Sequence, residues 1–379
     1  MSLALCLIMK NESKFLEPFF SNSFADNIYV LDTGSDDDSV AIAQKYTKNI
    51  FKKEFNNNFS SLRNYLIGLV KEDWILFLDA DEILLQAEWK KLRRLIDEDP
   101  EVGGYRFLRY NFFATGGWYS DMMVKVFKNN EGFKYQKKAT ERIEPSIIKK
   151  GFKVADAPIT LNHFGYVRSF EDRNKKNNQY ISIMQDQILA NPEDTLAKSA
   201  LAIIQRNSGD LPNATANALE GAAANPNSEL AQLFLGYVYE SSNKLDLAIK
   251  QYRKVLEINS GNYRALNALG VVYLSKGEYA AAREYFEHAI AVFPIGTHLN
   301  INLGLTYFFE GNYRKAIYLF KKVLAENPYF GLLDQKGILE IDNQKQFYYE
   351  TINNYWGLKT YLAVCKEAIG NDEEFFFHL

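Results

Sequence analysis

The sequence predicts a chain of two parts: an α/β domain with a mixed sheet, followed by an all-α array of stacked helix pairs. Up to about residue 165, short apolar runs alternate with helical patterns, which is typical of a parallel sheet covered by helices. From about residue 190 the sequence instead repeats itself every 34 residues, a period typical of helix-turn-helix units. The 379 residues suffice for two domains of ordinary size.

Composition narrows the class of protein. With 47% hydrophobic and 24% charged residues the chain is an ordinary globular one, and a formal charge of −3 creates no field that would attract nucleic acid or an anionic membrane. Cys6 and Cys365 lie at opposite ends, which is no disulfide framework and suits a reducing compartment. No apolar run reaches the ~20 residues of a membrane span. We expect a cytoplasmic protein without a nucleic-acid partner or a membrane span; peripheral contact with a membrane complex is compatible with this.

The first part should contain a parallel core that continues into antiparallel strands. Strands are predicted over Leu3–Met9, Asn27–Leu31, Asn49–Phe55 and Trp74–Leu78, and helices over Ser13–Phe24, Ser39–Tyr46 and Ser60–Val70. Trp74–Leu78 is apolar throughout, as expected of a strand buried on both faces. Gly103–Phe113 and Met122–Phe127 alternate like antiparallel strands. The sheet is therefore expected to be mixed.

The second part carries the signature of tetratricopeptide (TPR) repeats. The motif Leu-Gly-x-x-Tyr starts at Leu235, Leu269 and Leu303. The same interval separates small residues at Ala214, Ala248, Ala282 and Ala316, turn residues at Gly209, Asn243, Gly277 and Gly311, and helix-ending residues at Pro192, Pro226, Ser260, Pro294 and Pro328. Small residues let two helices approach closely, and proline ends a helix. A 34-residue helix-turn-helix period indicates TPR units.

These patterns give a domain plan. We expect the α/β domain over residues 1–170, a connecting helix over 171–190 and the repeats over 191–330. Residues 331–379 should form an atypical helical cap, because Tyr361-Leu362-Ala363 and Gly370-Asn371-Asp372 look like half a further unit that is out of phase.

The strongest chemical signal is Asp79-Ala80-Asp81-Glu82, directly after the strand Trp74–Leu78. Ligands of open α/β sheets bind at the carboxyl ends of the strands. Two acids one residue apart can share a divalent cation and a sugar hydroxyl, and carboxylate oxygens suit Mg²⁺ or Mn²⁺ bridging a diphosphate. The alternative is a polar strand-to-helix turn in which one acid caps the next helix.

Two weaker signals accompany it. One follows the second strand, where Asp32-Thr33-Gly34-Ser35 leads into the consecutive acids Asp36, Asp37 and Asp38. Its alternative is a glycine turn with a helix cap, although a cap needs only one acid. The other is Asn58 to Asn64, in which Ser60 could be a plain cap and Arg63 a solvated charge.

In this order and spacing the three signals resemble the inverting family-2-type glycosyltransferases of the GT-A fold, over roughly residues 1–170. The family's Asn-Glu pair matches Asn11-Glu12, its Asp-Ser-Gly-Ser-x-Asp loop matches Asp32 to Asp37 with Thr33 in place of Ser, and its Arg-Asn pair matches Arg63-Asn64. The resemblance implies that Asp37 and Arg63 hold the nucleotide base, Asp79 meets the ribose and Asp81 ligates the metal. It also assigns Asn11, Glu12, Asp32 and Asn64 to nucleotide-sugar binding.

Three further segments look like those of bacterial transferases fused to TPR repeats, including S- and O-glycosyltransferases that modify bacteriocin peptides or flagellin. They are Lys125–Lys128, Glu141–Ile147 and Asn162–Tyr166. This resemblance adds Lys125 to the nucleotide-sugar site and makes Glu141 the first candidate for the catalytic base, with Glu144 second. Thr140 stands where those relatives carry the His of a His-Glu pair, so this chain keeps the carboxylate of that pair but not the imidazole.

Two candidates complete the expected site. His163 is the only histidine in the first half; it is either a structural residue or, with Asp81, a ligand of Mn²⁺ or Mg²⁺, as the family's His-x-Gly-Tyr pattern implies. The other histidines should be structural. Gly116-Gly117-Trp118-Tyr119 is either a closing lid, with Gly117 as hinge and Trp118 and Tyr119 stacking on a sugar, or a hairpin turn with core aromatics.

Together these expectations describe an inverting transferase that moves a sugar from a nucleoside-diphosphate sugar, UDP favoured, to Ser, Thr or Cys of a polypeptide docked by the TPR groove. Self-association into a homo-oligomer is the alternative use of the repeats. Two other functions stay open: synthesis of a surface polysaccharide or lipid-linked glycan, and a non-catalytic TPR scaffold. The sequence leaves the nucleotide, the sugar and the acceptor atom undetermined.

Overall fold

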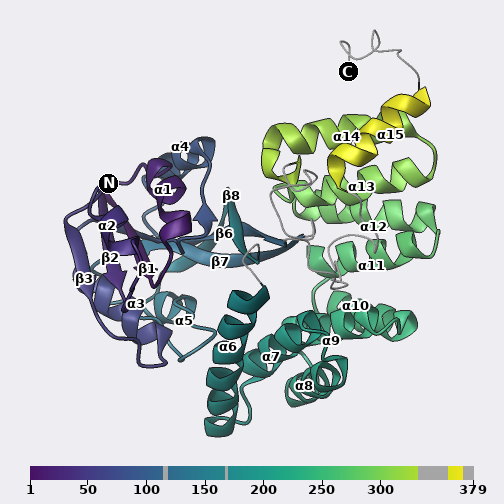
Figure 1. The fold of residues 1–379 in the computed structure, drawn as a ribbon. Coiled ribbons are helices and arrows are strands. Elements are labelled where there is room, and N and C mark those ends of the chain that lie inside the picture. The colour runs from purple at the N-terminus through teal and green to yellow at the C-terminus, as the bar shows by residue number, and fades with distance from the viewer. Residues whose placement is uncertain (114–117, 167–169, 332–356, 370–379) are drawn as a thin grey trace. The chain divides into compact units, whose positions relative to one another are not determined.

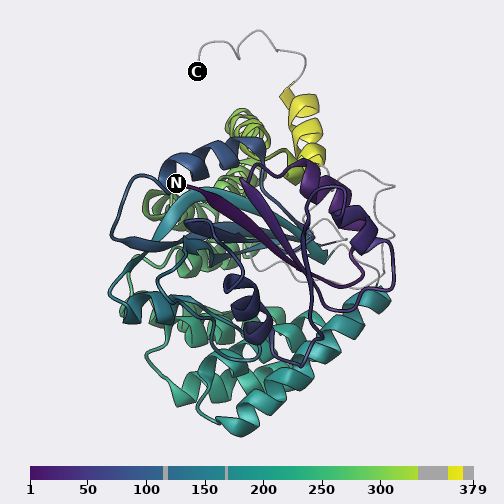
Figure 2. The same cartoon turned by 90° about the vertical axis from the view of Figure 1, so that its left-hand side faces the viewer.

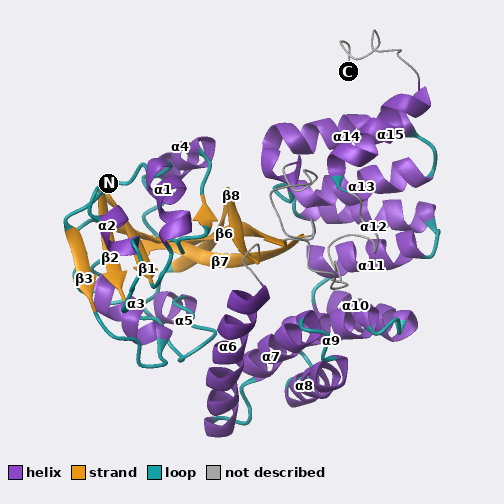
Figure 3. Cartoon of the chain, viewed as in Figure 1, coloured by secondary structure: helices purple, strands orange, loops and turns teal. Residues whose placement is uncertain are grey.

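The computed structural model describes residues 1–113, 118–166, 170–331 and 357–369. The chain divides into two compact units, the first made of Met1–Phe112 and Ser120–Asn191, the second of Phe113–Tyr119 and Pro192–Leu379. Within the described residues, every strand lies before residue 167 and only helices follow, as Figure 3 shows. This confirms an α/β domain with a mixed sheet followed by helical repeats.

Among the described residues, eight strands form one sheet in the order β3-β2-β1-β4-β7-β6-β8-β5. Their bounds are β1 Leu3–Met9, β2 Asn27–Asp32, β3 Asn49–Lys52, β4 Trp74–Phe77, β5 Glu82–Ile83, β6 Val102–Phe113, β7 Trp118–Lys128 and β8 Lys153–Tyr166. The first four run parallel, whereas β7 pairs antiparallel with β4, and β5 antiparallel with β8. The predicted switch from parallel to antiparallel strands is thus confirmed.

Alternation along the central strands builds a core on each face of the sheet. In β1, Leu5 and Leu7 belong to one apolar cluster while Cys6 belongs to the other, because successive side chains of a strand point to opposite faces. Helices cover both faces, as Figures 1 and 2 show. The first cluster includes residues of α1 (Ser13–Ser21), α2 (Ser39–Ala43) and α4 (Gln86–Leu95), and the second those of α3 (Phe59–Ile67) and α5 (Glu144–Lys149).

In the second unit, helix pairs repeat with the expected period. The helices are α7 Thr195–Asn207, α8 Leu211–Ala224, α9 Glu229–Ser241, α10 Leu245–Ile258, α11 Tyr263–Ser275, α12 Tyr279–Val292, α13 Thr297–Phe309 and α14 Tyr313–Glu326. A Cβ on Gly236, Gly270 or Gly304 would lie within 2.5 Å of the ring of Tyr252, Phe286 or Phe320 respectively. The glycine of each Leu-Gly motif therefore admits an aromatic ring of the second helix.

The turns and the flanking helices follow the sequence pattern as well. Gly209, Asn243, Gly277 and Gly311 all have positive φ, the conformation that ends a helix and favours glycine or asparagine. Before the repeats lies α6 (Phe170–Ala190); after them come a 3₁₀ turn (Pro328–Gly331) and α15 (Leu358–Ile369). The described helices include none that is long and apolar enough to cross a membrane.

Candidate active site

The predicted acids meet at one edge of the sheet. Strands β1, β2 and β4 are parallel neighbours, so their carboxyl ends share an edge. Asp32 is the last residue of β2 and pairs with Met9 at the end of β1. Asp79 and Asp81 follow Phe77, the last residue of β4. This is the edge at which open α/β sheets bind ligands.

Glu82 fixes the turn that carries the two acids. Its Oε2 accepts a hydrogen bond from the backbone N–H of Asp79 at 2.9 Å. Lys125 Nζ donates to both Glu82 oxygens, at 2.7 and 2.6 Å, and Arg109 Nη1 donates to Oε1 at 3.1 Å. Glu82 is 1% exposed; such a buried carboxylate needs cationic partners. Lys125, expected to contact the nucleotide sugar, lies buried against Glu82 and so contributes to the shape of the turn.

Arg63 joins two carboxylates that are far apart in sequence. Its Nη2 lies 3.5 Å from Asp79 Oδ1 and its Nε donates to Glu141 Oε1 at 3.3 Å. The guanidinium lies over the rings of Phe77 and Tyr135, at 5.1 and 5.3 Å from their centroids, where cation–π attraction holds it. Partial burial acts to raise the pKa of Asp79, but Lys125 and Arg63 outweigh it and lower that pKa to about 2.

Asp81 and His163 also lie together, as expected. His163 Nε2 is 3.4 Å from Asp81 Oδ1, and β5–β8 pairing sets Glu82 opposite His163. A Cβ at Gly165 would lie 2.4 Å from His163 Nε2 and 3.1 Å from Asp81 Oδ2. Any other residue at position 165 would therefore displace the side chains of His163 and Asp81. The described residues contain no group of three or more His, Cys, Asp or Glu arranged to hold a metal. One oxygen and one nitrogen donor fit Mn²⁺ or Mg²⁺ when diphosphate oxygens complete the shell.

The loop after β2 is held by its own acids. Asn11 exchanges two hydrogen bonds with Asp36, at 2.6 and 2.9 Å. Asp32 Oδ1 accepts from the N–H of Ser35, and Asp37 accepts from the N–H groups of Ser39 and Ser13. Burial acts to raise the pKa of Asp37, but hydrogen bonds from the side chains and the N–H groups of Ser39 and Ser13 hold it at about 2. Glu12 is buried, and its N–H donates to Ser39 Oγ at 2.8 Å.

Two other predicted residues have partners of their own. Glu144 Oε1 accepts from Arg142 at 3.3 Å. Asn64 binds the backbone N–H and C=O of Tyr135 with its side-chain amide.

Of the predicted lid, Gly117 lies outside the described residues and Tyr119 packs against the cluster of Tyr237 and Leu269. Trp118 is 1% exposed, and its ring lies edge-on to His298 and Phe330 within the second unit. A ring packed in this way must leave its partners before it can stack on a sugar.

Sequence reasoning missed Arg109, Asn111 and Asp121. Asn111 Oδ1 lies 2.6 Å from His163 Nδ1, and its Nδ2 donates to Asp121 Oδ2 at 3.3 Å. Arg109 donates to both Asp121 oxygens and also to Glu82. One signal was available: Arg109 and Asn111 are alternate polar residues of β6, whose only other polar side chain, apart from those of its tyrosines, is that of Arg106.

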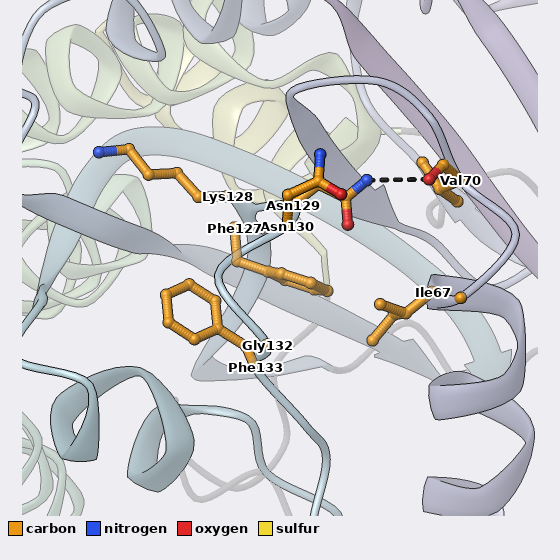
Figure 4. Close-up of a pocket in the computed structure, with 9 residues that line it drawn as sticks. Ile67, Val70, Phe127, Lys128, Asn129, Asn130, Gly132 and Phe133 are labelled. Atoms are coloured by element: carbon orange, nitrogen blue, oxygen red, sulfur yellow. Dashed lines mark hydrogen bonds between the residues drawn. The ribbon is translucent and has the colours of Figure 1, made fainter.

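A pocket at the other end of the sheet is unrelated to these acids. It is lined by Ile67, Val70 and Phe133 among others, and Asn129 Nδ2 donates to the Val70 carbonyl at 3.0 Å beside it (Figure 4). Lys128, which also lines it, pairs with Trp74 at the amino end of β4. Asp79 and Asp81 follow the carboxyl end of that strand, so the pocket is separate from the candidate site.

The fold and site define a class of protein: the chain resembles glycosyltransferases of the GT-A fold that carry C-terminal TPR repeats. Residues 5–155 match the family described as glycosyl transferase family 2. Residues 227–295 and 262–325 match the tetratricopeptide repeat. The two matches cover the α/β part and the helical part separately.

Two curated relatives each match about half of this chain. A TPR repeat-containing protein of Synechococcus elongatus is 28% identical over 55% of this chain and 53% of its own length. The SPbeta prophage-derived glycosyltransferase SunS of Bacillus subtilis is 28% identical over 50% of this chain and 45% of its own. The chain thus spans about half the length of the curated relatives it matches. Among solved structures, MamA is 22% identical with a TM-score of 0.35, covering 43% of this chain and 96% of that one.

Proposed function

We propose that the chain transfers a sugar from a nucleoside-diphosphate sugar, UDP favoured, to a Ser, Thr or Cys side chain of a polypeptide. The observation that carries this proposal is the meeting of Asp79, Arg63 and Glu141 with Asp81 and His163 at one edge of the sheet. The family match over residues 5–155 supports the chemistry, as does the similarity to SunS, a glycosyltransferase.

A divalent cation would be held by Asp81 and His163. When bound, it neutralises charge that develops on the diphosphate leaving group. The chain's own residues do the rest: Asp79 meets the ribose, and Arg63 and Asp37 hold the base. Gly165 has no Cβ, which would otherwise lie 2.4 Å from His163 Nε2, the nitrogen that would face the cation.

The transfer itself is a single displacement. The acceptor oxygen or sulfur attacks the anomeric carbon as the bond from that carbon to the diphosphate oxygen breaks, and the electron pair leaves with the diphosphate. Glu141 takes the acceptor proton as general base. Its contact with Arg63, at 3.3 Å, orients the carboxylate beside the donor site. Attack on the face opposite the leaving group inverts the anomeric centre.

A panel of nucleotide sugars tests the donor half of this proposal. The purified chain should release nucleoside diphosphate from one of them, slowly with water and faster with an acceptor polypeptide, and that donor should raise the melting temperature when Mn²⁺ is present. A chain that neither binds nor cleaves any donor would be a non-catalytic TPR scaffold. Faster transfer to a lipid-linked acceptor than to any polypeptide would favour glycan synthesis instead.

The repeats supply the reason to propose a polypeptide acceptor, because stacked helix pairs form a concave surface that receives extended peptides. We expect the first helix of each pair to line this surface. Arg264 lies on α11, a first helix, whereas Arg283 lies on α12, a second helix. We expect Arg264→Ala to raise KM for the polypeptide about tenfold, the effect of losing one hydrogen bond to a charged group, and to leave donor hydrolysis unchanged. Steady-state kinetics with both substrates measures this.

Arg283→Ala is the matched control. Arg283 pairs with Glu310 at 2.7 Å on the surface, so its loss should change neither constant. An Arg264→Ala chain with normal KM for the polypeptide and an altered oligomeric state would show that the repeats serve assembly, and the polypeptide-acceptor proposal would lose its support.

A further inference from the structure

The imidazole of His163 is held between two groups. Nδ1 lies 2.6 Å from Asn111 Oδ1, and Nε2 lies 3.4 Å from Asp81 Oδ1. A neutral imidazole carries its proton on one nitrogen only, and the partner of that nitrogen decides which. The lone pair, and with it the ability to bind a cation, is on the other nitrogen. The orientation of the Asn111 amide therefore determines what Nε2 can do.

Asp121 sets that orientation. Its Oδ2 lies 3.3 Å from Asn111 Nδ2, and a carboxylate only accepts hydrogen bonds. The NH₂ end of the amide must therefore face Asp121, which leaves the carbonyl end facing His163. Because an amide oxygen also only accepts, Nδ1 of His163 must be the donor.

Arg109 in turn fixes Asp121. Its Nε donates to Oδ1 at 3.0 Å and its Nη2 to Oδ2 at 2.7 Å, the bidentate geometry of a guanidinium facing a carboxylate. The Arg109 side chain is 13% exposed, and Asn111 is fully buried. A buried network in which each member has its partners is rigid.

The same arginine closes the network on the acidic turn. Arg109 Nη1 donates to Glu82 Oε1, and Glu82 Oε2 accepts the N–H of Asp79. Glu82 also pairs with His163 across β5 and β8, so the network links back to the histidine through the backbone. The network thus positions the turn and the imidazole against each other.

We propose that Arg109, Asp121 and Asn111 are positioning residues that hold the proton of His163 on Nδ1, so that Nε2 and Asp81 together offer a nitrogen and an oxygen donor to a divalent cation. The cation rests on the proposed function, whereas the tautomer does not. Groups behind a metal-binding histidine fix its tautomer and ring orientation in this way, and their loss typically lowers metal affinity about 10–100-fold.

Nitrogen NMR of the histidine side chains tests the tautomer on the chain alone, without cation or donor. The chain has four histidines, and the signal that His163→Gln removes is that of His163. When its imidazole is neutral, His163 should carry its proton on Nδ1, whereas imidazoles in water favour Nε2. A proton on Nε2 of His163 would overturn the proposal.

Two variants extend the test to cation binding, measured by calorimetry with Mn²⁺ and UDP. Asn111→Leu removes the acceptor, and Asp121→Asn keeps the shape but lets the neighbouring amide turn either way. Both should mix the tautomers and weaken Mn²⁺ binding about 10–100-fold. If the buried Asn111→Leu chain does not fold, Asp121→Asn decides alone. Unchanged tautomer and affinity in a folded Asp121→Asn chain would contradict the role of the network.

Asp156→Asn is the matched control, because Asp156 pairs with Arg106 between β8 and β6, at 2.6 Å and largely exposed. It should change neither readout. The outcomes also separate this inference from the proposed function. An Nδ1-protonated His163 in a wild-type chain that binds no Mn²⁺ would overturn the cation assignment and leave the network standing. If the chain binds Mn²⁺ but His163 carries its proton on Nε2, the role of the network would be overturned and the cation assignment would stand.

Discussion

Asp81→Asn should lower the rate of sugar transfer about 10³-fold or more while the fold survives. The substitution keeps the size of the side chain and removes its charge, 3.4 Å from His163 Nε2. Stabilising the charge of a leaving group with a cation contributes several kcal/mol, and each ~1.4 kcal/mol is a factor of ten in rate. Excess chelator should reduce wild-type turnover to the same level. The measurement is product formation at saturating donor, with circular dichroism to verify the fold.

The control for this experiment is again Asp156→Asn, the same substitution on β8 at an exposed ion pair. It should transfer sugar at the wild-type rate. Wild-type turnover that continues undiminished in excess chelator would exclude a cation at Asp81, and the charge of the leaving group would then have to be met by Arg63 and other side chains.

Local pattern predicted most of the fold. The apolar run Trp74–Leu78 predicts a buried strand, and the 34-residue repeat predicts helix pairs, from the residues of one segment alone. The sequence reading missed α4, α5, β5 and β8, and it extended α1 to Phe24 although the helix ends at Ser21. Helix α4 begins after Leu85, which has no capping side chain, and α5 has six residues, so neither carries a strong start signal. β5 has only two residues.

The site was predictable where it follows one strand and unpredictable where it depends on strand pairing. Asp79 and Asp81 end a single recognisable strand. In contrast, Arg63 and Glu141 are 78 residues apart, and only the family resemblance linked them. The network around His163 draws on three strands: Asn111 on β6, Asp121, which binds Asn111, on β7, and Glu82 on β5. The register in which the strands pair determines these contacts, and no local sequence pattern predicts that register.

The structure also bears on the choice between the two candidate bases. Glu141 and Glu144 are three residues apart and chemically alike. Glu141 contacts Arg63, the arginine that also contacts Asp79, whereas Glu144 begins α5 and pairs with Arg142. This difference makes the pair of substitutions a matched experiment.

Glu141→Gln should bind the nucleotide sugar nearly as well as wild type and lose about 10²–10⁴ in transfer rate, the usual effect of removing a positioned general base. Glutamine keeps the size of the side chain and still reaches Arg63 with its carbonyl oxygen, so the fold and the donor site should persist. Donor binding is measured by calorimetry and transfer by product formation. Glu144→Gln, with the same chemical change next to Arg142, should transfer normally; the reverse result would give the role of base to Glu144.

The size of the loss carries further information about the acceptor atom. A hydroxyl is scarcely ionised at neutral pH and depends on its base, whereas a thiol with a pKa near about 8.5 is already partly thiolate. A full loss of about 10⁴ in Glu141→Gln would therefore favour Ser or Thr as acceptor. A smaller loss, recovered as the pH rises through about 8.5, would favour Cys, since thiolate formed by the solvent then replaces the missing base. A wild-type rate at every pH, with both Glu141 and Glu144 replaced, would mean that no protein carboxylate at these positions takes the proton.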